Sequence, residues 1–227
     1  MTKFAPLAVV ALSTLAVQNP NTVPNTLPAA GRAKLMASLK AAEPHRQHVW
    51  RDTLPINADG TINGYIEIGR GDRRKWEHDM TANRLVIDRM IPEKLGGYPI
   101  NYGFVPQTVS YDGDPFDVLV LGPPLRGGTI VRGIAVGVMY MEDEKGLDSK
   151  VVTSPVDAAG KARFRLTGAI QRDVGEFFKR YKLHEAGAFS RVPGWGPASD
   201  GQALVRMTHA FFKSCREVTT GPCVVAR

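Results

Sequence analysis

Cysteine, acidic residues near the start and long apolar runs are all scarce in this chain of 227 residues. The mostly apolar stretch from Phe4 to Val17 is too short to span a membrane. The only two cysteines, Cys215 and Cys223, lie close together near the C-terminus. They could close a small loop in an oxidising compartment, and otherwise they are two free thiols. The sequence shows no internal repeat.

The N-terminal region has the layout of a cleavable secretory signal. Lys3 precedes the apolar stretch, a segment rich in Pro, Asn and Thr follows it, and no acidic residue occurs before Glu43. We therefore predict a signal peptide over residues 1–30, cleaved near Ala16 or at Ala29-Ala30. Residues 31–48 are predicted to be a linker with a weak helical tendency, and residues 49–227 the folded domain. An uncleaved anchor or an organellar presequence is the alternative.

This layout predicts a protein exported to the periplasm or the extracellular space, with no stable membrane insertion after processing. A cytoplasmic location is the alternative. The formal net charge is +7, but Lys and Arg are scattered among Asp and Glu, so no nucleic-acid-binding stripe is evident. A basic chain around an acidic cluster suits an anionic, metal-binding ligand such as a phosphate. Charge alone fits a generic basic protein equally well.

Periodicity along the chain predicts several strands followed by helices. With 43% hydrophobic residues, the chain can bury one good core. Alternation predicts strands over residues 65–68, 84–90 and 130–140, and a hairpin over residues 142–152. Helical spacing predicts helices over residues 173–183 and 200–215. The fold class expected from this order is α+β, mainly β, with helices outside the sheet.

Three carboxylates occur within six residues, at Asp112, Asp114 and Asp117. They repel one another unless a multivalent cation lies between them. Gly113 allows a tight backbone and Pro115 turns the chain, so Asp117 can come back toward the other two. Oxygen-only ligands suit a hard cation such as Mg²⁺, Mn²⁺ or Ca²⁺. An acidic β-turn without a metal is the alternative for this motif alone.

Further polar residues complete a set suited to phosphoanhydride hydrolysis. That reaction needs metal ions to lower the pKa of a bound water, and cations to neutralise the departing phosphate. The set comprises the carboxylates Glu67, Glu77, Asp143 and Asp148, the cations Lys75, Arg89, Lys150 and Lys182, and the tyrosines Tyr98, Tyr102 and Tyr181.

The sequence from Asp112 to Val118 fits at every position the signature of the soluble family I inorganic pyrophosphatases, which this chain resembles from about residue 65 to 182. Supporting motifs follow in order: Ile66-Glu67-Ile68, Lys75-Trp76-Glu77, Asp88-Arg89, Tyr98-Pro99, Asn101-Tyr102-Gly103, Asp143-Glu144, Asp148-Ser149-Lys150 and Tyr181-Lys182. The resemblance implies a five-stranded OB-like β-barrel with external helices and a homo-oligomer. Gly69 and Trp76 depart from the family pattern, which usually has proline and tyrosine there.

The resemblance also implies an activity and a role for each candidate residue. The activity is Mg²⁺-dependent hydrolysis of inorganic pyrophosphate to two phosphates by direct attack of a metal-activated water. Several Mg²⁺ ions per site are expected, with Mn²⁺ or other divalent cations as substitutes. The implied metal ligands are Glu67, Asp112, Asp117, Asp143 and Asp148. The implied catalytic residues are Asp114, Asp117 and Tyr102. The implied phosphate-binding residues are Lys75, Arg89, Tyr102, Lys150, Tyr181 and Lys182, with Glu77 and Tyr98 in support.

Two other functions remain open from the sequence. One is hydrolysis of another phosphoanhydride, either polyphosphate or a nucleotide. The other is a non-enzymatic OB-like binding module, but carboxylates dominate the polar residues and would repel a nucleic acid. A calcium-binding EF-hand loop starting at Asp112 is excluded, because it would need Gly and Glu where this chain has Asp117 and Pro123.

Overall fold

Strands outnumber helices in residues 20–226, the part of the chain that this computed structural model describes. The helices are α1 (Ala29–Ala42), α2 (Val49–Asp52), α3 (Gly168–Arg180) and α4 (Ala198–Ser214), with a short 3-10 helix at Glu93–Leu95. The strands are β1 (Thr26–Leu27), β2 (Ile62–Ile68), β3 (Arg74–Asp79), β4 (Arg84–Met90), β5 (Asn101–Phe104), β6 (Asp117–Val120), β7 (Ile130–Asp143), β8 (Gly146–Leu147), β9 (Lys150–Pro155), β10 (Ser190–Gly196) and β11 (Cys223–Val224). None of the helices in these residues could cross a membrane.

The central sheet has the strand order β10-β7-β2-β5-β6-β9, with β8 paired to β7. Strand β9 also pairs with β7, so the pairings from β7 through β2, β5, β6 and β9 lead back to β7. Only the pairing of β6 with β9 is parallel in this sheet. Strands β3 and β4 form a separate hairpin, and β1 pairs with β11. The expected class, α+β with mostly sheet, is confirmed.

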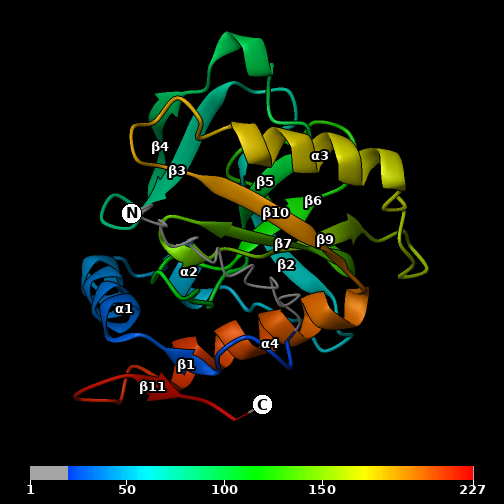
Figure 1. The fold of residues 1–227 in the computed structure, drawn as a ribbon. Helices are drawn as coiled ribbons and strands as arrows, with labels where there is room; N and C mark the ends of the chain where they lie inside the picture. The colour runs from blue at the N-terminus through cyan, green and yellow to red at the C-terminus, as the bar shows by residue number, and fades with distance from the viewer. Residues whose placement is uncertain (1–19, 227) are drawn as a thin grey trace, which may run out of the picture.

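Apolar side chains on the two faces of the sheet form two separate cores. Along β6 and the residue after it, Val118 and Val120 face one core, whereas Leu119 and Leu121 face the other. This alternation follows from the two-residue period of a strand. Figure 1 shows α3 above the sheet and α4 below it. Fully burying a phenylalanine, such as Phe178 of α3 or Phe211 of α4, contributes about 1.5–3 kcal/mol.

Helix α3 follows the apolar spacing expected for it. Val174, Phe177 and Phe178 are buried, and so is Tyr181 at the C-cap. The helix begins five residues before the predicted start of Asp173, because Thr167 caps it by accepting a hydrogen bond from the Ile170 backbone N–H. Tyr181 ends the helix, which places the following residue, Lys182, at the edge of the sheet.

The linker predicted for residues 31–48 is wrong, because this segment is packed onto the domain. It contains most of α1, whose inward face holds Gly31, Leu35 and Ala42. Two of these three residues are small, so hydrophobic periodicity is weak and the helix reveals itself poorly in the sequence. Residues before it are also part of the fold, since Val23 and Leu27 are buried. The apolar stretch of the predicted signal peptide lies outside the described residues.

The first and last strands of the described residues pair with each other beside α4. Leu27 of β1 pairs with Cys223 of β11, and a disulfide joins Cys223 to Cys215 at the end of α4. Figure 1 shows β1 and β11 side by side along that helix, with α1 next to them. Val23 and Leu27 share one hydrophobic core cluster with Leu35 of α1 and with Cys223.

Candidate active site

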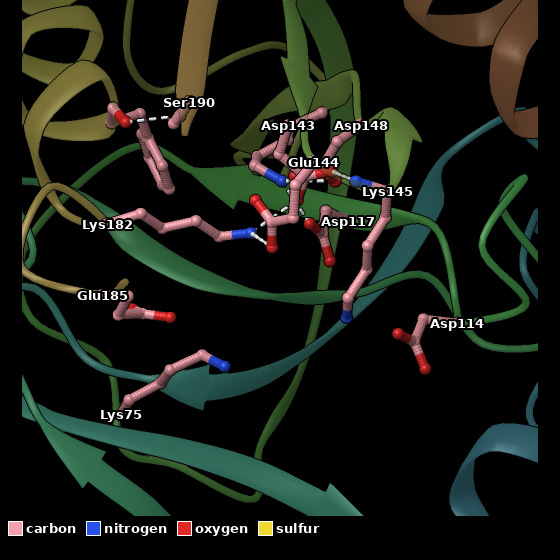
Figure 2. A network of polar contacts seen from close by, with 12 residues as sticks. Lys75, Asp114, Asp117, Asp143, Glu144, Lys145, Asp148, Lys182, Glu185 and Ser190 are labelled. Atoms are coloured by element: carbon pink, nitrogen blue, oxygen red, sulfur yellow. Dashed lines mark hydrogen bonds and ion pairs between the residues drawn. The ribbon is translucent and has the colours of Figure 1, made fainter. Parts of the chain in front are cut away.

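A cavity of about 400 Å³ opens where the acidic loop (residues 110–117), strands β2 and β3, the β7–β8 turn and the residues after α3 meet. The carboxylates on its wall come from four separate parts of the chain. They are Glu67, Glu77, Asp112, Asp114, Asp117, Asp143 and Asp148. Figure 2 shows Lys75 and Lys182 reaching toward this group from neighbouring elements. Acidic side chains distant in sequence thus share one cavity.

The parallel pairing of β6 with β9 brings Asp117 and Lys150 together. Val118 lies opposite Val151, so the residues preceding them stand at the same end of the two strands. The Lys150 side chain is only 1% exposed, and its Nζ forms ion pairs with Asp117 and, at 2.8 Å, with Asp148 Oδ1. Burial by itself would lower the pKa of Lys150, but the two carboxylates outweigh it and raise that pKa. Lys150 therefore stays charged beneath the cavity.

A second buried lysine neutralises the turn between β7 and β8. Lys182 Nζ lies 2.6 Å from Asp143 Oδ2 and 2.8 Å from Glu144 Oε1. Asp143 also accepts a hydrogen bond from the Lys145 backbone N–H, which shapes the turn. Burial opposes the charge of Lys182, but its bonds to both carboxylates raise its pKa. The end of α3 is thereby attached to the turn (Figure 2).

The β3–β4 hairpin supplies a third group of charges. Lys75 lies opposite Arg89 in the strand register, and its Nζ pairs with Glu77 and, at 3.0 Å, with Asp88 Oδ2. Arg89 pairs with Asp88 and reaches Glu185 at 2.6 Å. Lys75 and Glu77 line the cavity, whereas Arg89 lies beside it. Arg89 would have to leave Glu185 to bind a phosphate in the cavity.

Hydrogen bonds donated by backbone N–H groups within the acidic loop fix its shape. The Asp114 backbone N–H donates to Asp112 Oδ1 at 3.0 Å, and the Ser110 N–H donates to the Asp114 carbonyl at 2.6 Å. Gly113 has φ of 89°, a conformation that favours glycine. Burial, together with the nearby Asp112 charge, raises the pKa of Asp114 to about 6, while Lys34 opposes that rise.

Two carboxyl groups of the wall have raised pKa values, because they are buried and lie near other carboxylates. Burial raises the pKa of Glu67 to about 8, and the charges of Asp117 and Glu77 add to the rise. Glu67 is fixed by a hydrogen bond from the His78 backbone N–H at 2.7 Å. Burial likewise raises the pKa of Asp148 to about 7; the charge of Lys150 opposes this rise and that of Asp117 adds to it. Added cations would relieve this repulsion.

The three candidate tyrosines divide between the cavity and the core. Tyr102 and Tyr181 line the cavity, and Lys150 Nζ lies 5.7 Å from the centre of the Tyr102 ring. Tyr98 is 1% exposed and packs on Phe177, with ring centres 4.9 Å apart. Tyr98 is absent from the cavity wall and packs in the core beneath α3.

Divalent metal ions fit the donor chemistry of this wall, but no ready-made cage exists. Within residues 20–226, no group of three or more His, Cys, Asp or Glu side chains is arranged to hold a metal ion. Instead, Asp117 and Asp148 share the ammonium group of Lys150. All seven cavity carboxylates offer oxygen donors, which Mg²⁺ and Mn²⁺ prefer. The predicted ligands therefore lie on one wall without being gathered around one point.

A family model described as inorganic pyrophosphatase matches residues 64–213. The chain belongs to the inorganic pyrophosphatase family. It is similar to the "Inorganic pyrophosphatase" of Aeropyrum pernix, with 38% identity over 163 residues, which cover 69% of this chain and 92% of that protein. This confirms the resemblance to family I noted from the acidic motif.

Solved pyrophosphatase structures share the fold. The inorganic pyrophosphatase from Thermus thermophilus has a TM-score of 0.67 and 32% identity, covering 74% of this chain and 99% of that one. The enzyme from Coxiella burnetii has a TM-score of 0.65 and 35% identity, covering 71% of this chain and 100% of that one. Both relatives are matched almost throughout, whereas more than a quarter of this chain lies outside each match.

Most residues predicted for a pyrophosphatase site meet at the cavity. Those on its wall are Glu67, Lys75, Glu77, Tyr102, Asp112, Asp114, Asp117, Asp143, Asp148, Tyr181 and Lys182. Lys150, Arg89 and Tyr98 lie behind or beside the wall. Several further residues line the cavity without having been predicted for the site, among them Lys34, Ser38 and Lys145. Lys34 and Ser38 were assigned to a linker, and Lys145 follows two acidic residues in a turn, so none of these three residues belonged to a motif.

The departure from the family pattern at Gly69 has a local cause. A Cβ atom at this position would lie 2.4 Å from the Leu125 carbonyl oxygen, so neither alanine nor proline fits without a backbone shift. The other departure, Trp76, donates a hydrogen bond from its Nε1 to Asp72 at 3.1 Å. Neither residue lines the active-site cavity, and both changes leave the metal-ligand candidates in place.

Replacing Lys150 by methionine is expected to destabilise the metal-free pyrophosphatase by about 3 kcal/mol, the lower end for breaking a buried ion pair. The lower end applies because the partner Asp148 side chain remains 25% exposed. Chemical denaturation in EDTA measures the change, and Mg²⁺ should restore more stability to the variant than to the wild type. Lys145→Met, at an exposed turn, is the control and should change stability by less than about 0.5 kcal/mol. Equal effects of the two substitutions would contradict this account.

Proposed function

We propose that this protein hydrolyses inorganic pyrophosphate to two phosphates in a Mg²⁺-dependent reaction. The observation that carries the proposal is the single cavity of about 400 Å³ that holds seven carboxylates with lysines on and behind its wall. Carboxylates suit the metals, and lysines suit the phosphate oxygens. Relatives named inorganic pyrophosphatase at 30% identity or more support it.

Asp112, Asp117 and Asp148 are the proposed ligands of the first metal ion, with Asp143 and Glu67 serving further ions. Bound Mg²⁺ would lower the pKa of a water molecule and reduce the negative charge on the substrate. Asp117 and Asp148 both pair with the ammonium group of Lys150, so their carboxylate oxygens already lie close together for a cation that takes its place. Mn²⁺ or another divalent cation would serve the same oxygen donors.

The chain's own residues position the reactants. Asp114 orients the attacking water or accepts its proton. Tyr102 lines the same cavity and hydrogen-bonds the nucleophile or the substrate. As the new bond from water oxygen to phosphorus forms, the bridging P–O bond breaks. Charge on the departing phosphate is neutralised by lysines of the wall, foremost Lys75 and Lys182, with Tyr181 beside them.

The architecture we propose for the core is the five-stranded OB-like barrel of the family. Strands β7, β2, β5, β6 and β9 form this barrel. Each pairs with the next, and the pairing of β9 with β7 supports its closure. The expected homo-oligomer stays a prediction.

Asp117→Asn is expected to reduce phosphate release from pyrophosphate by about 10²–10³-fold, because an amide is a poorer metal ligand and carries no charge. The assay compares pyrophosphate, tripolyphosphate and ATP, each with Mg²⁺ and with EDTA. Wild-type activity should be highest on pyrophosphate and absent in EDTA. Asp157→Asn, in an exposed turn, is the matched control and should retain full activity. Full activity of Asp117→Asn, or a preference for ATP, would overturn the proposed function.

Export of the protein is a separate proposal. The Cys215–Cys223 disulfide supports it, since such bonds persist in oxidising compartments. Cleavage at Ala29-Ala30 would remove β1 together with the buried Val23 and Leu27. Cleavage near Ala16 would keep all three, so we place the processing site there.

N-terminal sequencing of the cellular protein should therefore find a start between residues 15 and 22 in the exported fraction. A purified chain starting at residue 19 should be as stable as the processed protein. One starting at residue 31 should lose several kcal/mol, since each fully buried apolar side chain contributes about 1.5–3 kcal/mol. An intact start at Met1 or Thr2 in the cytosolic fraction would refute cleavage and export.

A further inference from the structure

Helix α1 lies before residues 64–213, the part matched by the family model, and yet it forms part of the active-site wall. Two of its side chains, Lys34 and Ser38, line the same cavity as the predicted catalytic carboxylates. The helix therefore belongs to the part of the chain that the family model does not match. We therefore considered what this helix adds to the site.

Glycine-to-glycine packing fixes α1 against the acidic loop. A Cβ atom on Gly31 would lie 2.4 Å from the Tyr111 carbonyl oxygen, and one on Gly113 would lie 2.6 Å from Lys34 Cβ. Such distances leave no room for a side chain at either position. The Tyr111 hydroxyl also donates to the Pro24 carbonyl at 2.6 Å, which ties the loop to the residues preceding α1. Helix and loop therefore form one rigid unit.

This packing places the Lys34 ammonium on the carboxylate of Asp114. Nζ lies 2.7 Å from each of the two carboxylate oxygens. The torsion about the last bond of an aspartate is broad, so a free carboxylate can turn. An ammonium shared by both oxygens narrows that rotation and sets the direction in which the remaining lone pairs point.

We propose that Lys34 is a positioning residue of the active site: it orients the Asp114 carboxylate toward the attacking water and so makes α1 a working part of the enzyme. This inference rests on the proposed pyrophosphate hydrolysis. Lys34 acts through Asp114 and does not hold the substrate itself. Its loss should therefore lower kcat and leave KM for pyrophosphate unchanged.

The direct test is the steady-state kinetics of Lys34→Met with pyrophosphate and saturating Mg²⁺. We expect kcat to fall by about 10- to 100-fold, the cost of a small misplacement of a catalytic group, with KM within twofold of the wild type. Lys34→Arg should recover much of kcat, because it restores a cation that can reach both oxygens. Lys40→Met, an exposed lysine on the same helix, is the matched control and should behave as the wild type. Lys34→Gln replaces the methionine variant if the latter fails to fold.

Coupling to Asp114 is tested by a double-mutant cycle. In the Asp114→Asn background, Lys34→Met should change kcat by less than twofold, because there is no carboxylate left to orient. Gly31→Ala keeps both charged groups but pushes α1 off the loop, and it should lower kcat as Lys34→Met does. Additive losses, an increase in KM alone, or unchanged kinetics of Lys34→Met would each overturn the inference. If the wild type does not hydrolyse pyrophosphate, the proposed function itself is refuted. The same assay shows this before any variant is compared.

Discussion

Repulsion among carboxylates gathered on one wall is the constraint on which the site depends. Asp117 and Asp148 lie close enough to share one ammonium group, and Lys150 supplies it from beneath the cavity. Lys182 does the same for Asp143 and Glu144. Without these lysines the metal-free protein would bury unpaired charges at a cost of several kcal/mol. The buried lysines therefore let the protein fold before any divalent cation is bound.

The fold brings this arrangement about by joining elements that are distant in sequence. The parallel contact of β6 with β9 sets Asp117 beside Lys150. The end of α3 brings Lys182 to the β7–β8 turn, and the β3–β4 hairpin brings Lys75. Two cores on opposite faces of the sheet hold these pieces at fixed distances. The two departures from the family pattern lie outside the cavity lining, and the close approach of Gly69 to the Leu125 backbone explains one of them.

Sequence reasoning identified the parts of the site that carry a motif or a period. The acidic loop, strand β4 and the apolar faces of α3 and α4 all followed from local patterns. Helix α1 showed only a weak helical tendency, and its packing onto the domain was missed, because its buried face is made largely of glycine and alanine, which leave little hydrophobic period. For the same reason Lys34 was missed. The pairing of Arg89 with Glu185 and the burial of Tyr98 depend on packing between distant segments, which no local pattern encodes.

Divalent metal ions are expected to bind the wall carboxylates, including those now paired with lysines. A crystal structure of the protein grown with Mn²⁺, measured at the manganese absorption edge, tests it most directly. Anomalous peaks are expected in the cavity, within about 2.5 Å of carboxylate oxygens of Asp112, Asp117 and Asp148. Peaks elsewhere on the surface, or a cavity without manganese in which Lys150 still joins Asp117 to Asp148, would contradict it.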